Sequence, residues 1–245
     1  MTVMERVNVL GMAFDNHTMA EFMTILGKRM RQEQGTFIVT ANPEIVMYAR
    51  EHPEYQRLVD EADFVTADGI GVVKGAQILG TPIKERVTGF DLMVNLLQLA
   101  AQQGYRVYLI GAKPGIADAA AKKAAQEFPG LQIVGTHDGY FELGDTQVDQ
   151  AIIAAKPDMV FAAMGYPRQE QFIAALRNHL PDALFMGVGG SFDVLSGTVK
   201  RAPVFMQKAH LEWFYRLLKE PTRFKRMLIL PKFLRVVHQE AKKPK

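Results

Sequence analysis

The sequence predicts an α/β domain in which helices cover both faces of a largely parallel sheet. Short apolar runs that end in Gly, Asp or Asn alternate along the chain with longer segments of helical periodicity. The 245 residues are enough for one large domain with an appendage. Hydrophobic residues make up 48% of the chain and charged residues 22%, as in ordinary globular proteins. We therefore expect a Rossmann-like domain whose ligands bind where the carboxyl ends of the strands open.

The elements follow in order from these patterns. Strands are predicted where the chain is apolar over a short run bounded by turn residues, at 7–10, 36–41, 64–67, 106–111, 132–135, 159–164 and 183–187. Helices are predicted where apolar residues recur at helical spacing, at 18–31, 43–60, 89–103, 115–128, 146–155 and 168–179. Thr88 stands three residues before Asp91, which is the spacing of a capping box at a helix start.

The end of the chain differs in charge from the rest. Residues 200–245 hold 13 Lys or Arg and three Glu, whereas residues 1–199 hold 16 Lys or Arg and 23 Asp or Glu. We therefore divide the chain into an α/β domain, 1–199, and a basic appendage, 200–245, with two or three helices from residue 204 onward. A basic segment of this kind binds phosphates in nucleic acid, in a membrane surface or in a phosphorylated substrate.

Large apolar and basic residues alternate in the appendage, as in the run Arg223-Phe-Lys-Arg-Met-Leu228. This composition is typical of an amphipathic segment on anionic lipid, where each basic residue contributes about 1 kcal/mol. The alternative is a helix that packs on the domain and exposes a basic face. Both interpretations remain open at this point.

Cysteine is absent, which excludes disulfides, thiolate nucleophiles and sulfur-ligated zinc. The six histidines never take the His-Glu-x-x-His spacing of a zinc site. The N-terminus has no basic region followed by an apolar core, and the chain contains no run of about 18 apolar residues. We expect a cytoplasmic protein that carries neither a signal peptide nor a spanning helix.

Two glycine pairs resemble the start of a dinucleotide-binding fingerprint but do not complete it. Gly69-Ile-Gly71 would need a third glycine at Lys74, and Gly187-Val-Gly189 would need one at Phe192. No P-loop sequence is present. The sequence therefore disfavours a nicotinamide enzyme and a P-loop nucleotidase.

Polar side chains follow two predicted strands near the first half of the sheet. Thr40 and Asn42 end one strand before Pro43 begins a helix, and Asn42 can either face a ligand or cap that helix. Asp68 follows the next strand and precedes Gly69. A carboxylate there can act as a general base, although Asp-Gly is also a common turn.

Two further loops follow strands in the second half. Arg168 and Gln169 begin a helix, where an arginine can meet a diphosphate or pair with a nearby acid. The segment from Gly187 to Asp193 is rich in glycine, which lets a flat ring or a phosphate approach the backbone, and Asp193 can accept hydrogen bonds from a nucleobase. A glycine loop without a fingerprint is by itself a weak signal.

Eight segments, in this order and covering nearly the whole chain, resemble the WecG/TagA/CpsF family of bacterial glycosyltransferases. They are Thr40-Ala-Asn42, Thr66-Ala-Asp-Gly69, Arg86-Val-Thr-Gly-Phe-Asp91, Asp138-Gly-Tyr-Phe141, Met164-Gly-Tyr-Pro-Arg-Gln-Glu170, Gly187-Val-Gly-Gly-Ser-Phe-Asp193, Lys200-Arg-Ala-Pro203 and Glu212-Trp-Phe-Tyr-Arg216. The chain looks most like members that transfer N-acetylmannosamine from UDP, with inversion, to the 4-hydroxyl of GlcNAc-diphospho-undecaprenol in wall teichoic acid synthesis.

The resemblance implies a role for each matching residue. Asp68 would be the general base, with Thr40 and Asn42 beside it, and Arg86 and Gln169 would hold sugar or phosphate. The uracil would be received by Asp193 and the backbone of Gly187, Val188, Gly189 and Gly190. Arg216, Arg223 and Arg226 of the appendage would reach a diphosphate.

The resemblance also implies an enzyme without metal or other cofactor, and the sequence has no Asp-x-Asp triplet for a divalent ion. Arginines and backbone donors would then meet the charge of the leaving group. The appendage would dock on the anionic inner face of the membrane, so that the enzyme is peripheral.

Three alternatives remain open. Other family members use N-acetylmannosaminuronate or glucose donors, and a uronate requires an additional cation that the sequence does not locate. A nucleic-acid-binding module would bind through the basic appendage in a salt-sensitive manner. The aromatic residues of the appendage stand among aliphatic ones rather than in a base-stacking platform, so we do not expect nucleic acid. Whether the protein forms a homo-oligomer is left open.

Overall fold

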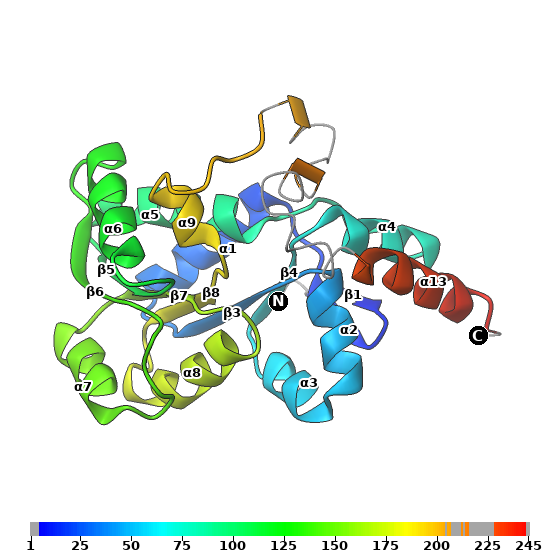
Figure 1. The fold of residues 1–245 in the computed structure, drawn as a ribbon, viewed down its shortest axis with the longest axis horizontal. Coiled ribbons are helices and arrows are strands. Elements are labelled where there is room, and N and C mark those ends of the chain that lie inside the picture. The colour runs from blue at the N-terminus through cyan, green and yellow to red at the C-terminus, as the bar shows by residue number, and fades with distance from the viewer. Residues whose placement is uncertain (1–4, 204, 207–211, 213, 216–227, 244–245) are drawn as a thin grey trace.

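A six-stranded parallel sheet forms the centre of the molecule in the computed structural model (Figure 1). The structure describes residues 5–203, 205–206, 212, 214–215 and 228–243. The strands lie in the order β4-β3-β8-β7-β5-β6, and every neighbouring pair is parallel. Their bounds are β3 Thr36–Ala41, β4 Phe64–Ala67, β5 Arg106–Gly111, β6 Gln132–His137, β7 Met159–Ala163 and β8 Leu184–Gly187. The parallel order brings all six carboxyl ends to one edge.

Helices cover both faces of the sheet, which confirms the predicted class (Figure 1). One face carries α1 Met19–Arg31, α5 Gly89–Gln103, α6 Ile116–Glu127 and α9 Ser191–Leu195. The other carries α2 Pro43–Glu51, α3 Pro53–Asp60, α7 Thr146–Ala155 and α8 Arg168–Leu176, which a 3-10 turn, Arg177–His179, extends. Alternate strand residues face opposite sides: Phe37 and Val39 belong to the core on the side of α2 and α3, whereas Ile38 belongs to the core on the side of α1 and α5.

The first predicted strand belongs to a separate hairpin. β1 Arg6–Val9 pairs antiparallel with β2 Met12–Asp15 in a two-stranded sheet. Leu10 and Gly11 connect them with φ angles of 56° and 100°, and positive φ at both residues suits the twist of a two-residue hairpin loop. β2 was not predicted, because Leu-Gly is not one of the usual hairpin dipeptides.

The predicted helix 43–60 is in fact two helices. α2 ends at Glu51 and α3 begins at Pro53, because Pro53 has no amide hydrogen to continue the helix. His52, which precedes the proline, has the non-helical angles φ −132° and ψ 85°. The second helix therefore starts in a new direction.

Two helices beside the sheet pack closely on each other. α4 Ile70–Ile78, which was not predicted, contacts α13 Ile229–Ala241, and α13 also contacts α2 (Figure 1). A Cβ added to Gly75 would lie 2.9 Å from Cζ of Phe233, so glycine is required for this approach. Phe233 and Val237 of α13 are fully buried there. The described end of the appendage is thus a helix packed on the domain.

The opposite side of α13 is basic, with Lys232 and Arg235 exposed. Among the helices that the structure describes, none is long and apolar enough to cross a bilayer. The remaining helices expected from residue 204 onward fall mostly outside the described residues. The division at residue 200 remains a prediction.

Candidate functional site

A pocket of about 360 Å³, here called the Asp68 pocket, opens over the carboxyl ends of β4, β3 and β8. It brings together most of the residues predicted from the sequence to touch substrate. Those that line it are Thr40, Asn42, Asp68, Arg86, Gln169, Val188 and Gly189. They come from five separate segments, because parallel strands deliver the loops that follow them to one edge.

Asp68 directly follows β4, and its carboxylate lies at the first residue of α5, Gly89. Its backbone N–H donates to the Ala41 carbonyl at 2.9 Å, and its carboxylate accepts the N–H of Gly89 at 3.1 Å. Gly89 is the first residue of α5, where the helix dipole favours a negative charge. A Cβ at Gly89 would come within 3.1 Å of Oγ1 of Thr40 and 3.3 Å of Asp68 Oδ2, so this glycine lets the three residues meet.

Thr40 and Asn42 hold the floor of the pocket together. The Thr40 hydroxyl, which is buried, donates to the Gly187 carbonyl at 3.0 Å and so joins the ends of β3 and β8. Asn42 Oδ1 accepts the N–H of Ile45 at 3.0 Å, which makes Asn42 the cap of α2. The cap interpretation is confirmed, and the same residue also lines the pocket.

Four charged residues form a network at one wall of the Asp68 pocket. Arg86 donates to Glu212 at 2.6 Å, and Arg201 makes two hydrogen bonds to Asp91, at 2.7 and 2.9 Å. Glu212 also lies 3.4 Å from Arg201, whose guanidinium stacks 4.9 Å above the ring centre of Phe90. Neither Arg201 nor Glu212 was predicted as a site residue, because the spacing of their segments in the sequence gives no sign that they meet Arg86.

The electrostatics of Asp91 follow from this network. Burial alone would raise the pKa of Asp91, but hydrogen bonds from Arg201 and Thr88 more than offset that effect, so the pKa lies below its usual range. In turn, burial would lower the pKa of Arg201, but its carboxylate partners raise it. Both groups therefore stay charged at neutral pH.

The first turn of α8 carries Gln169 and Glu170, which turn inward beneath the pocket. Gln169 Oε1 accepts the N–H of Gly189 at 3.0 Å, and its Nε2 donates to Glu170 Oε1 at 2.8 Å. A Cβ at Gly187 would lie 2.5 Å from Nε2 of Gln169, so glycine leaves the space that this amide occupies. Glu170 is fully buried, and burial raises its pKa to about 7.

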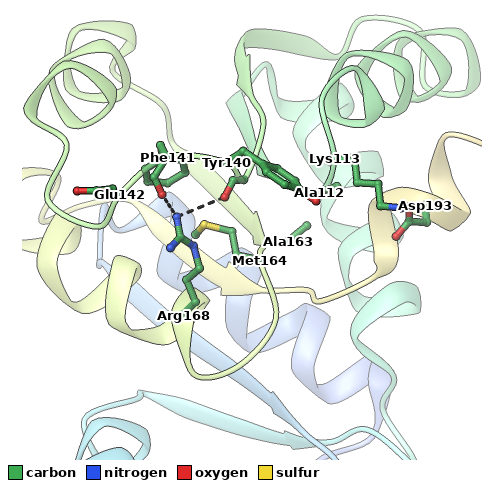
Figure 2. Close-up of a pocket in the computed structure, with 10 residues that line it drawn as sticks. Ala112, Lys113, Tyr140, Phe141, Glu142, Ala163, Met164, Arg168 and Asp193 are labelled. Carbon is green, nitrogen blue, oxygen red and sulfur yellow. Dashed lines mark hydrogen bonds between the residues drawn. The ribbon is translucent and has the colours of Figure 1, made fainter. Parts of the chain in front are cut away.

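A second cavity of about 660 Å³, here called the Tyr140 hollow, lies beside the Asp68 pocket over the ends of β5, β6 and β7 (Figure 2). It contains Arg168, Asp193, Lys113 and Tyr140, whose side chain is 70% exposed. Asp193 lies in the first turn of α9. Tyr140 was not among the predicted site residues, although it stands in the segment that begins at Asp138.

Arg168 holds the loop that forms one wall of the hollow. Its guanidinium donates to the carbonyls of Gly139 and Phe141 and stacks 5.1 Å from the ring centre of Phe141 (Figure 2). The partners of Arg168 are thus backbone carbonyls rather than the carboxylate considered from the sequence. Arg168 and Gln169, adjacent in the chain, serve different cavities because their side chains leave the helix in different directions.

The structure divides the predicted site residues between these two cavities. Gly187, the last residue of β8, lines neither cavity, and its carbonyl accepts the hydrogen bond of the Thr40 hydroxyl. Arg216, Arg223 and Arg226 lie outside the described residues. Within the described part of the chain, no group of three or more His, Asp or Glu side chains could hold a metal ion.

The chain is similar to known glycosyl transferases over nearly its whole length. The family model described as "Glycosyl transferase WecG/TagA/CpsF family" matches residues 7–245. A relative from Bacillus spizizenii is 46% identical over 86% of this chain and 82% of its own length. A relative from Bacillus subtilis is 39% identical over 99% of this chain and 94% of its own length. A relative from Staphylococcus aureus is 38% identical over 100% of this chain and 99% of its own length. All three relatives are named N-acetylglucosaminyldiphosphoundecaprenol N-acetyl-beta-D-mannosaminyltransferase. The chain therefore belongs to the WecG/TagA/CpsF family of glycosyl transferases.

Proposed function

We propose that this protein transfers N-acetylmannosamine from UDP-N-acetylmannosamine to the 4-hydroxyl of GlcNAc-diphospho-undecaprenol, forming the β-1,4 linkage unit of wall teichoic acid. The observation that carries the proposal is the Asp68 carboxylate, which lines a pocket together with Arg86 in a chain whose relatives bear that activity in their names. The pocket supplies a base and a cation at one place. Those are the groups that sugar transfer from a nucleotide requires.

In the proposed reaction, Asp68 removes the proton of the acceptor 4-hydroxyl while that oxygen attacks C1 of the donor sugar. The bond between C1 and the phosphate oxygen breaks on the opposite face, which inverts the configuration and releases UDP. Negative charge develops on the leaving diphosphate. We expect Arg86 of the pocket to bind it, with Arg216, Arg223 and Arg226 of the appendage as further candidates, and the proton remains on Asp68 until the products leave.

The Tyr140 hollow suits the nucleotide of the donor. Asp193 can accept the N3–H of uracil, the exposed ring of Tyr140 can stack on the base, and Lys113 can meet a phosphate. Helix α9 joins the two cavities, because Asp193 lines the hollow while Ser191 and Val194 line the Asp68 pocket. A nucleotide in the hollow would thus direct its sugar toward Asp68.

The charges around the Asp68 pocket favour a neutral donor sugar over a uronate. Among the described residues that line it, the arginines are Arg86 and Arg201, and each already forms an ion pair with a carboxylate. A uronate would have to compete with Glu212 or Asp91 for these cations. The same argument does not separate N-acetylmannosamine from glucose, so the experiment includes both.

An apolar rim supports a peripheral position at a membrane that holds the acceptor. Ile229 and Leu230, at the start of α13, line the Asp68 pocket, and the neighbouring Leu228 is 55% exposed. The appendage adds basic residues that attract anionic lipid. A lipid-linked acceptor could then enter the pocket from the bilayer surface.

The proposal is tested by measuring UDP release from UDP-N-acetylmannosamine, its uronate and UDP-glucose, with and without a short-chain GlcNAc-diphospho-lipid. We expect acceptor-dependent release from UDP-N-acetylmannosamine alone. Turnover with the uronate or with glucose instead would change the donor and keep the family. If none of the donors supports release, salt-sensitive binding of RNA becomes the next measurement.

A further inference from the structure

Glu170 is a buried acid that the proposed reaction does not use. It is fully buried at the first turn of α8, and its Oε1 accepts a hydrogen bond from Nε2 of Gln169 at 2.8 Å. Gln169 in turn accepts the N–H of Gly189 through its Oε1 at 3.0 Å. Val188 and Gly189 line the Asp68 pocket. A chain of two hydrogen bonds therefore runs from Glu170 to the wall of the site.

The direction of this chain depends on the accepting oxygen that Glu170 offers to Gln169. An amide side chain has an accepting oxygen and a donating nitrogen, and a flip exchanges their positions. An ionised carboxylate only accepts, so it holds the donating end of Gln169 toward itself and the accepting end toward Gly189. With the amide reversed, the NH₂ group would face the N–H of Gly189, and both hydrogen bonds would be lost.

These two hydrogen bonds end at Gly189, whose backbone conformation needs support. Gly189 has a φ of +51°, in the left-handed region, between the end of β8 and the start of α9. The Gly187 position has no Cβ, which leaves the space where the Gln169 amide passes. Gln169 itself is 2% exposed, so it acts from beneath the loop.

We propose that Glu170 is a positioning residue that orients the Gln169 amide and, through it, holds the Gly189 backbone in the wall of the Asp68 pocket. The effect on transfer rests on the proposed function. The effect on the Gly189 backbone does not, and the two are measured separately.

The surroundings of Glu170 are aromatic. The Tyr55 hydroxyl of α3 faces its carboxylate, and burial together with this carboxylate raises the pKa of Tyr55 well above its usual value. Tyr55 contacts Tyr48 of α2 and Tyr166, which lines the Asp68 pocket. His52, stacked on Tyr48 with ring centres 3.8 Å apart, is the histidine of this cluster.

The test observes the backbone amide of Gly189 directly by NMR. Labelling valine with ¹³C at the carbonyl and glycine with ¹⁵N selects Val-Gly pairs, and the chain has two of them, Val134-Gly135 and Val188-Gly189. Gly135, in β6, serves as an internal control because it lies far along the sheet from Glu170. The exchange rate of each amide hydrogen reports whether its hydrogen bond is kept.

We expect Glu170→Ala to speed exchange at Gly189 about tenfold or more and to leave Gly135 unchanged. Glu170→Gln keeps an accepting oxygen for Gln169, so it should retain slow exchange at Gly189. The matched control is Glu54→Gln, because Glu54 occupies the first turn of α3 but is exposed. Slow exchange at Gly189 in a folded Glu170→Ala protein would overturn the proposal.

Should Glu170→Ala fail to fold, the wild type and Glu170→Gln decide the question by titration. The Gly189 resonance should shift with pH around neutrality in the wild type and stay constant in Glu170→Gln, which retains His52. Equal shifts in both proteins would assign the effect to His52 and overturn the proposal. Transfer is then measured in Glu170→Ala. If that variant does not fold, transfer by Glu170→Gln is compared with transfer by the wild type above and below pH 7.

In the transfer assay, kcat should fall about a hundredfold in Glu170→Ala, with the KM for donor changed less, because a displaced wall disturbs the reacting geometry. Glu170→Gln should retain most of the wild-type kcat. Loss of transfer in every variant including wild type would instead count against the proposed function, while the Gly189 measurement would stand.

Discussion

Arg86 and Glu212 form a 2.6 Å ion pair between residues 126 positions apart in the sequence. Both side chains are largely buried, and Glu212 also faces Arg201, which is bound to Asp91. The pair ties the appendage to the loop before α5. The appendage thus contributes to the wall of the pocket in which Asp68 lies.

This pair should be energetically coupled. In a double-mutant cycle of Arg86→Gln and Glu212→Gln, we expect a coupling of about 1–3 kcal/mol in the free energy of unfolding, since a charged hydrogen bond out of water is worth that much. The control cycle is Lys232→Gln with Glu51→Gln, an exposed 2.8 Å pair expected to couple by less than about 1 kcal/mol. Equal coupling in both cycles would show that the Arg86 pair stabilises the fold no more than an exposed ion pair does.

Asp68→Asn should abolish transfer without unfolding the protein. Removing a general base costs roughly a hundred- to ten-thousandfold in kcat, whereas the asparagine oxygen can still accept the Gly89 N–H. Measured affinity for UDP and the melting temperature should remain near wild type. Asp60→Asn, at an exposed end of α3, is the control. Near-normal turnover of Asp68→Asn would remove Asp68 from the role of base.

Phe233→Ala should release α13 from α4. The Phe233 ring is fully buried against Gly75, and truncating such a side chain costs about 3–5 kcal/mol. Transfer should fall as well, because Ile229 and Leu230 at the start of α13 line the pocket. Calorimetry and limited proteolysis near residue 230 check the two effects.

The control for this change is Phe205→Ala. Phe205 is 70% exposed, so its truncation should alter the free energy of unfolding by no more than about 0.5 kcal/mol. If both variants melt alike, the packing of α13 on α4 does not contribute to stability.

Glu170→Gln should make the stability of the protein less sensitive to a rise in pH from 5 to 8. Burial raises the pKa of Glu170 from 4.5 to about 7, so the folded state resists ionisation. Below pH 4.5 the acid is neutral in both folded and unfolded chains, and above pH 7 it is ionised in both. The wild type therefore loses stability between these values as pH rises, by on the order of 3 kcal/mol.

Urea unfolding at pH 5 and pH 8 measures this loss. The difference between the two pH values should be smaller in Glu170→Gln than in the wild type, while Glu54→Gln should behave as the wild type does. A wild-type difference that persists in Glu170→Gln would locate the sensitivity elsewhere.

Binding to anionic vesicles should depend on basic residues of the appendage. Lys219→Gln with Lys225→Gln should weaken binding to phosphatidylglycerol vesicles roughly thirtyfold, because each lysine near the surface contributes about 1 kcal/mol. Lys122→Gln with Lys123→Gln, an exposed pair on α6, removes the same charge from the domain and should change binding little. Equal loss from both double variants would indicate a general effect of net charge.

The sequence by itself predicted the framework of the domain. The strands 36–41, 64–67 and 106–111 and the helices 89–103 and 146–155 have the bounds that the structure shows. These elements are specified locally, by apolar runs, helical periodicity and caps within a few residues. The order of strands and loops likewise brought Thr40, Asn42, Asp68 and Gln169 into one pocket, because parallel strands place the loops that follow them at one edge.

Only the tertiary structure decided which partners these residues meet. α4 contains two glycines, Gly71 and Gly75, which lower its helical propensity, yet Phe233 packs on it from more than 150 residues away. Arg168 binds carbonyls, and Glu170 is buried beside Tyr55. Such contacts join segments distant in the chain, and they depend on how whole faces pack. A local sequence pattern does not determine that packing. The partners of Glu212 and Glu170 could therefore not be predicted from the sequence.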